Sequence, residues 1–170
     1  MAQLWLDKPA PMPEVPHGTK PTDTFQQKSE PYMPWATTEY EAMDGSGNLE
    51  VEPLTLNEPC PCTRSGFYKV SFLVKAQEGF DFVEFYSHWL NAHLPNVRST
   101  MEKVEGFRYV LSHSIEPQVE PYAGLVVLYF HDETGWARYT QAISPDGMEE
   151  WVDPAGTLVL SGNTEMIGLP

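Results

Sequence analysis

The chain has 170 residues, enough for one compact domain with an extension but hardly for two full domains. Its formal net charge of -14 disfavours nucleic acids and anionic lipids, because both bind proteins through clustered Lys and Arg side chains. A hydrophobic fraction of 41% argues against disorder, and no apolar stretch is long enough to span a membrane. We therefore expect a globular, cytoplasmic protein with a small, mostly neutral ligand.

Residues 1–65 contain ten of the 16 prolines of the chain. Proline fixes the backbone angle φ and removes a hydrogen-bond donor, so regular structure should be sparse in this segment. Its scattered aromatic side chains need a surface to pack against, which a disordered linker does not. We predict an extended N-terminal arm over residues 1–65, packed on the domain or on a partner subunit. Within it, residues 37–56 alternate on both sides of a Gly-rich turn, which predicts a hairpin.

The segment from residue 66 to residue 170 has dense hydrophobic periodicity and should form the folded domain. Alternation with period two over residues 67–75 predicts a strand, and apolar residues at helical spacing over residues 80–104 predict a helix. The expected elements that follow are strands over 106–116 and 122–132, a helix over 133–142, a helical turn over 146–152 and a strand over 157–169. This order, β-α-β-β-α-β, predicts an α+β fold with the ferredoxin-like split βαβ topology.

Two histidines and a tryptophan lie close together within FYSHWLNAHLPNV, residues 85–97. On a helix of 3.6 residues per turn, His93 falls on the apolar side with Trp89, whereas His88 falls on the polar side. Because Glu84 precedes His88 by four residues, we interpret His88 as a surface side chain with a weak ion pair.

Pro95 sets His93 apart from the other histidines. It cannot donate a hydrogen bond to the carbonyl of Asn91 and disfavours helical geometry at Leu94, so we expect the helix to kink or end there. The His93 ring would then project into the space between helix and sheet. A free carbonyl at the break could bind one ring nitrogen and leave the other for a substrate proton. His93 is thus either a general base or a buried histidine that the backbone satisfies.

This part of the chain resembles the EthD family of the dimeric α+β barrel superfamily, over residues 66–168. The residues that carry the resemblance are Tyr86, His88, Trp89, His93 and Pro95, with Gly106 and Phe107 opening the next strand. The resemblance implies a ferredoxin-like protomer, a homodimer formed sheet to sheet, and a cavity between sheet and helices in each subunit. Similar proteins include muconolactone-type isomerases, aromatic polyketide cyclases and fungal dehydratases, which move protons next to carbonyls without a cofactor. In several relatives the histidine that matches His93 is the proposed acid/base.

Other side chains are candidates for the same cavity. Tyr109 and His113 share one face of their predicted strand, which should face the helices, so His113 either divides acid and base roles with His93 or is a core histidine. Tyr86 either donates its phenol to a developing enolate or packs with its hydroxyl at the rim. The side chains expected to line the substrate cavity are Trp89, Tyr109, Tyr129 and Trp136.

The resulting hypothesis is a cofactor-free lyase or isomerase of the dehydratase, cyclase or lactone-isomerase type. His93 would abstract a proton α to a carbonyl, with His113 or Tyr86 stabilising or protonating the enolate. Two alternatives from other classes are a haem-binding dimeric α+β barrel protein with His93 as the iron ligand, and a non-catalytic small-molecule-binding or stress-associated dimer. Cys60 and Cys62 are wrongly spaced for a zinc site, and the chain lacks a P-loop and a Rossmann glycine pattern, so we expect neither a metal nor a cofactor.

Overall fold

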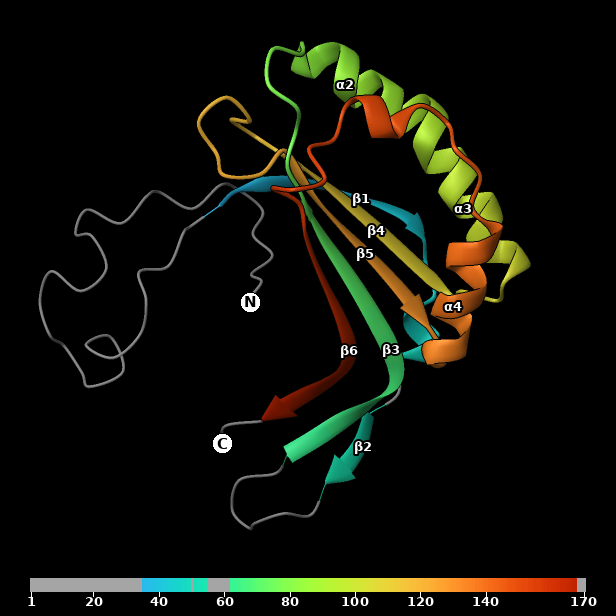
Figure 1. Ribbon diagram of the computed structural model, residues 1–170. Helices are drawn as coiled ribbons and strands as arrows, with labels where there is room; N and C mark the ends of the chain where they lie inside the picture. Colours follow the sequence, from blue (N-terminus) through green and yellow to red (C-terminus); the bar gives the residue numbers. More distant parts are fainter. Residues whose placement is uncertain (1–34, 50, 55–61, 168–170) are drawn as a thin grey trace, which may run out of the picture. The chain divides into compact units, whose positions relative to one another are not determined.

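The computed structural model describes residues 35–49, 51–54 and 62–167, which form a sheet with helices on one of its faces (Figure 1). Most of the predicted arm, with Cys60, lies outside the described residues. The strands are β1 (Thr37–Met43), β2 (Val51–Leu54), β3 (Cys62–Val74), β4 (Arg108–Ser114), β5 (Gly124–Phe130) and β6 (Leu158–Ile167). The helices are α2 (Phe82–His88), α3 (Leu94–Lys103) and α4 (Glu133–Ala142), with a π-helical turn over Trp89–His93 and 3₁₀ turns over Ser46–Asn48 and Met148–Glu150.

The sheet is antiparallel at every strand pairing. Its strand order is β1-β4-β5-β3-β2, and β6 also pairs with β3. The helical segment α2 to α3 connects β3 to β4, and α4 connects β5 to β6. These features confirm the predicted α+β class, and the inner order β4-β5-β3-β6 is compatible with a ferredoxin-like fold.

The hairpin predicted within residues 37–56 is wrong, although both of its strands exist. β1 pairs with β4 and β2 pairs with β3, so the two strands have different neighbours. Arg108 of β4 fixes the end of β1, because its Nη1 lies 2.7 Å from Glu41 Oε1 and 3.5 Å from Asp44 Oδ1. Alternation along a segment identifies a strand, but the edge that the strand joins depends on distant residues.

The core lies between the helices and one face of the sheet. Alternate residues of β3, β4 and β5 point into it, because successive side chains of a strand point to opposite faces of the sheet. They pack under the helical residues Phe85, Trp89, Val97 and Met101. The buried strand residues of this core are Val70, Val74, Tyr109, Leu111, Val126, Leu128 and Phe130.

The helical segment over the sheet continues past Pro95 (Figure 1), where we expected a kink or an end. It begins at Asp81, whose carboxylate accepts a hydrogen bond of 2.6 Å from the backbone N–H of Val83. The interruption takes the form of the π-helical turn, in which the Leu94 N–H donates to the Trp89 carbonyl five residues earlier. This wider turn places Pro95 in the first turn of α3, where its missing N–H costs little.

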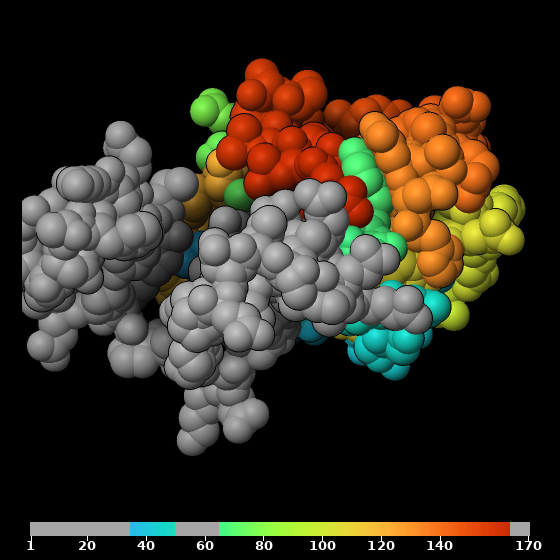
Figure 2. All heavy atoms as spheres, turned by 90° about the horizontal axis from the view of Figure 1, so that it is seen from below, coloured from blue at the N-terminus to red at the C-terminus, as the bar shows by residue number. Residues whose placement is uncertain are grey.

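Helix α4 occupies the residues predicted for the second helix. Asp132 caps it by accepting a hydrogen bond of 3.0 Å from the Gly135 N–H. Trp136 packs its ring against Phe72 of β3 and Phe130 of β5. Figure 2 shows β3 as a narrow green strip between α4 and the red C-terminal segment. Within the described ranges, no helix has the length and apolar character that crossing a membrane requires.

Candidate functional site

His93 forms a close pair with Asp146, a residue of the segment between α4 and the last 3₁₀ turn. His93 Nδ1 lies 2.8 Å from Asp146 Oδ2, and the two side chains are 22% and 15% exposed. Because the carboxylate accepts the Nδ1 proton, the lone pair of the neutral ring is on Nε2. Nε2 makes no hydrogen bond with the part of the chain that the structure describes. The site therefore holds one imidazole nitrogen and leaves the other for a ligand.

The Asp146 carboxylate is itself held in place. Asn96, three residues after His93, donates from Nδ2 to Asp146 Oδ2 at 2.6 Å and to the Ser144 carbonyl at 2.8 Å. The Met148 N–H donates to Asp146 Oδ1 at 3.1 Å. Both carboxylate oxygens thus have donors, which orients the ring of His93 through its partner.

The charge balance of the pair favours a neutral imidazole beside a carboxylate. Burial lowers the pKa of His93 from its ordinary value, and the charge and hydrogen bond of Asp146 only partly offset this effect. Burial alone would raise the pKa of Asp146, but hydrogen bonds from Asn96 and His93 and the charge of His93 outweigh it and lower this pKa. At neutral pH His93 is therefore in the protonation state of a general base.

His113 belongs to a separate, aromatic group between β4 and α2. Its ring stacks on Tyr86 with centroids 4.0 Å apart and an interplanar angle of 9°, and it also contacts Trp89 at 5.1 Å and Tyr40 at 5.2 Å. It is 4% exposed, and its Nε2 has no hydrogen-bond partner within the described residues. Burial lowers the pKa of His113 to about 4, so the ring is neutral at pH 7. The predicted position facing the helices is correct, but among the described residues no carboxylate forms a hydrogen bond or ion pair with this histidine.

The Tyr86 phenol is already bonded to the backbone. It donates to the Ala123 carbonyl at 2.7 Å, and the Ser114 carbonyl lies at 3.4 Å. Burial raises the pKa of Tyr86 to about 12. A phenol with this pKa and this partner favours the packing interpretation of Tyr86.

Trp89 and Tyr109 are the two predicted cavity residues that lie at the centre of the helix–sheet interface. Both are 0% exposed. Trp89 approaches β5 so closely that a Cβ atom on Gly124 would lie 2.9 Å from its ring. Trp136 belongs to α4 and contacts Phe72, Phe130 and the Tyr139 ring. It thus lines the α4 side of the core.

Tyr129 lies on the opposite face of the sheet and is not brought together with His93. Its neighbours in register are Lys69 of β3 and Arg108 of β4, whose cationic groups lie 5.6 and 5.9 Å from the centre of its ring. Its strand reads GLVVLYF, which is apolar at almost every position. A strand of this kind gives no alternation from which the covered face can be predicted.

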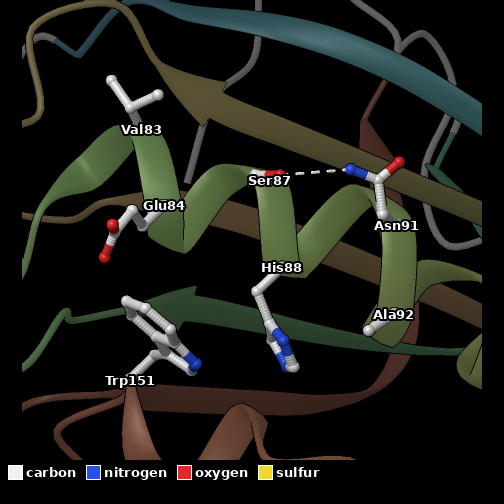
Figure 3. Close-up of a pocket in the computed structure, with 7 residues that line it drawn as sticks. All are labelled: Val83, Glu84, Ser87, His88, Asn91, Ala92 and Trp151. Atoms are coloured by element: carbon white, nitrogen blue, oxygen red, sulfur yellow. Dashed lines mark hydrogen bonds between the residues drawn. The ribbon is translucent and has the colours of Figure 1, made fainter.

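His88 lies under a neighbouring segment instead of on a free surface (Figure 3). Its ring stacks on Trp151 with centroids 5.8 Å apart, and its Nε2 is buried without a hydrogen-bond partner in the described chain. The predicted ion pair with Glu84 does not form between these two described residues. Both side chains instead line a shallow pocket of about 570 Å³ on the outer side of α2, together with Val83, Ser87, Asn91, Ala92 and Trp151.

The sequence prediction missed Asp146. The residues 144–147, Ser-Pro-Asp-Gly, indicate a turn, and Gly147 has the positive φ of 88° that glycine tolerates best. That signal explains the hydrogen bond to Met148 but not the pairing with a residue 53 positions earlier. Among the described residues, no group of three or more His, Cys, Asp or Glu side chains could hold a metal ion.

Comparison with known proteins gives this chain no family. No family model matches it, and no curated protein matches it either. Its likeness to the EthD family therefore rests on the short motif from Tyr86 to Pro95 and on Gly106 and Phe107.

Proposed function

We propose that the protein is a cofactor-free lyase or isomerase of the EthD type, acting on a small neutral carbonyl or cyclic compound. The observation that supports this proposal is the His93–Asp146 pair, with Nδ1 2.8 Å from the carboxylate and Nε2 without a hydrogen-bond partner in the described chain. A base in this arrangement can take a proton from the carbon next to a carbonyl. The C–H electron pair then forms the double bond of an enolate.

The second half of the reaction returns the proton from His93. Delivery to another carbon gives an isomerase, and delivery to a β-oxygen that departs as water gives a dehydratase. Asp146 stabilises the imidazolium that forms between the two steps, because its carboxylate accepts the Nδ1 proton throughout. A positioned base of this type contributes about 10²- to 10⁴-fold to a rate.

The test measures exchange of the hydrogen on the carbon next to the carbonyl, because this step is common to the isomerase and the dehydratase reactions. Lactones, β-hydroxy ketones and phenolic polyketides are incubated with the protein in D₂O, and NMR follows deuterium entering the position α to the carbonyl. We expect exchange with the native protein and its loss in His93→Gln. The matched control is His131→Gln, which changes an exposed histidine outside the site.

Two results would overturn the proposal. Exchange that persists in His93→Gln would remove His93 as the base. A Soret band that forms on adding haem to the native protein and disappears in His93→Gln would replace proton transfer by haem binding.

The proposal includes a homodimer that forms sheet to sheet. In support, helices α2, α3 and α4 cover one face of the sheet (Figure 1), and Leu160, which pairs with Ser71 on the opposite face, is 52% exposed. Its neighbours on that face, Val110, Leu125 and Val127, are buried at 6%, 5% and 3% exposure. A second layer over this face would also cover Leu160.

The dimer is tested by placing a charge on this face. We expect Leu160→Lys to weaken the dimer at least tenfold, as measured by analytical ultracentrifugation, because the ammonium would be buried in the interface. Val159 is the matched control, since it is also 52% exposed but pairs with Phe72 on the helix side. Equal dimer strength in Leu160→Lys and Val159→Lys would refute a sheet-to-sheet interface.

A further inference from the structure

The space between the helices and the sheet beside Trp89 is filled by side chains. Trp89 and Tyr109, which were expected to line a substrate cavity there, are both 0% exposed and belong to the hydrophobic core. A pocket of about 570 Å³ lies instead on the outer side of α2 (Figure 3). Its volume falls within the range of about 300 to 1,000 Å³ that is usual for small-molecule sites. A ligand of His93 therefore has space on this outer side and not in the core at Trp89.

The segment that follows α4 runs alongside α3 and α2 (Figure 1) and connects the His93–Asp146 pair to this pocket. Asp146 holds His93 at one end of the connection. The next residue, Gly147, lies against the ring of His88, because a Cβ atom on Gly147 would be 3.5 Å from Cε1 of that ring. Trp151 stacks on the same ring with centroids 5.8 Å apart, and both side chains line the pocket. The pair and the pocket are thus joined by direct contacts.

The pocket and the pair also share one side of the long helical segment. Glu84, His88 and Ala92 line the pocket at intervals of four residues, so they lie along one side of the helix. Asn96 comes four residues after Ala92 and donates a hydrogen bond of 2.6 Å to the Asp146 carboxylate. The row of residues that borders the pocket therefore leads to the site of the base.

The lining of the pocket favours a neutral, largely apolar ligand. Val83 lines it and is 78% exposed, and the ring of Phe80, which is 43% exposed, lies 4.9 Å from the ring of Trp151. Exposed apolar side chains that gather at a pocket are typical of a ligand-binding surface. Glu84 contributes a carboxylate, and the described lining contains neither Lys nor Arg, so an anionic ligand would be repelled.

We infer that the ligand of His93 binds in this outer pocket, with an aromatic ring against Trp151 and the carbon next to its carbonyl group at Nε2 of His93. This inference rests on the proposed function and deepens it, because it names the substrate class. The ligand extends from Trp151 past the ring of His88, which favours a fused bicyclic ketone or lactone over a small monocyclic one. Contact between its ring and the indole adds to the affinity, since aromatic rings attract each other beyond the area that they bury.

The binding test uses 1-tetralone, a neutral ketone fused to an aromatic ring, and measures its dissociation constant by NMR titration. Ser87 is an exposed lining residue, so Ser87→Trp places a large side chain in the pocket. We expect this variant to bind 1-tetralone on the order of 10- to 100-fold more weakly than the native protein. The matched control is Ser99→Trp, which changes an exposed serine of α3 outside the pocket and should keep the native affinity.

The deuterium exchange assay on 1-tetralone separates binding from chemistry. Ser87→Trp should raise KM and leave kcat unchanged, because the variant removes binding but not the base. Trp151→Leu should raise KM for 1-tetralone more than for cyclopentanone, which has no aromatic ring to contact the indole. A tryptophan that only stabilises the fold would change both KM values equally. His93→Gln should lose exchange and still bind 1-tetralone.

Equal affinity for 1-tetralone in Ser87→Trp and Ser99→Trp, or failure of the native protein to bind 1-tetralone, would overturn the inference. If His93→Gln loses exchange while the two serine variants bind equally well, the outer pocket is rejected and the proposed function is kept. If exchange persists in His93→Gln while Ser87→Trp binds weakly, the pocket is supported as a ligand site and the proposed function is rejected.

Discussion

His93 and His113 differ in their described neighbours: His93 has a carboxylate partner, whereas His113 contacts the rings of Tyr86, Trp89 and Tyr40. His93 is bonded to Asp146, and the pair is partly exposed. His113 stacks on Tyr86 and is 4% exposed, with no partner for its Nε2 within the described residues. Burial lowers the pKa of both rings, yet only His93 has a group that would stabilise its protonated form.

This difference shows that burial alone does not identify a catalytic histidine. A base must hold a proton for part of the reaction, so the site has to accommodate the imidazolium as well as the imidazole. Asp146 provides that accommodation at His93, whereas protonation of His113 would place an uncompensated charge among rings. The comparison therefore supports different roles for the two rings: the proposed proton transfer for His93, and packing for His113.

The largest expected effect comes from removing the partner of His93. Asp146→Asn should lower the rate of α-proton exchange by about 10²- to 10⁴-fold, because the imidazolium loses its carboxylate and the ring loses its fixed tautomer. The matched control is Glu149→Gln, which removes another negative charge that acts on His93 without bonding to it. Similar rates in the two variants would show that general electrostatics, and not the bonded pair, supports exchange.

The pH dependence of exchange gives a second measurement on the same pair. Because burial lowers the pKa of His93, the rate should remain level from neutral pH to below the ordinary value of 6.5 before it falls. Asp146 acts to raise this pKa, so its replacement by Asn should move the acid limb to still lower pH. If the acid limb of the pH–rate profile stays at the same pH in Asp146→Asn, or moves to higher pH, the pairing of Asp146 with His93 is contradicted.

The next largest effect concerns stability in acid. The unfolded chain binds a proton on His113 near pH 6.5, but the folded protein does so only near the pKa of about 4. Protons therefore favour the unfolded state between these values, and stability should fall by about 3 kcal/mol as the pH drops from 6.5 to 4. Urea unfolding measured across this range should show a smaller loss in His113→Phe than in the native protein.

A control separates this effect from the titration of other groups. Tyr86 and Tyr40, which face the His113 ring, are not charged in this range, so the difference between the two proteins reports His113 itself. His131→Phe changes an exposed histidine and should keep the native acid dependence. Parallel stability curves for the native protein and His113→Phe would mean that the ring is solvated.

The smallest effect is expected at the phenol that covers His113. Tyr86→Phe removes the hydrogen bond to the Ala123 carbonyl, which keeps its bond from the Ser114 N–H. The free energy of unfolding should therefore fall by only about 0.5 to 1 kcal/mol. Exchange should decrease far less than in Asp146→Asn, and a loss of similar size would restore Tyr86 as a participant in the chemistry.

Local patterns predicted the elements of the fold well. The helix predicted over residues 133–142 matches the bounds of α4, and alternation along β4 placed Tyr109 and His113 toward the helices. Both signals are local, because helical spacing and a period of two depend only on neighbouring positions. The motif residue His93 was also identified from its neighbours on the helix.

These local patterns could not predict which residues pair when they lie far apart in the sequence. Asp146 is 53 positions from His93, and its turn signal says nothing about the helix against which it lies. The predicted hairpin failed for the same reason, since β1 pairs with β4 and not with β2. Tyr129 was expected near the cavity but lies on the opposite face, and its strand, apolar at almost every position, gives no sequence signal that distinguishes the two faces.

The π-helical turn at Trp89–His93 sets the phase between the two halves of the long helix. It holds one residue more than an α-helical turn would, and one residue corresponds to a rotation of about 100° around the axis. Deleting a single residue there would leave the sequence of α3 unchanged. It would rotate Asn96 around the helix axis, away from Asp146, and break their hydrogen bond. The length of this turn, five residues, therefore determines which side chains of α3 face Asp146. An insertion or deletion at this point would change the site and leave the strands of the sheet unaltered.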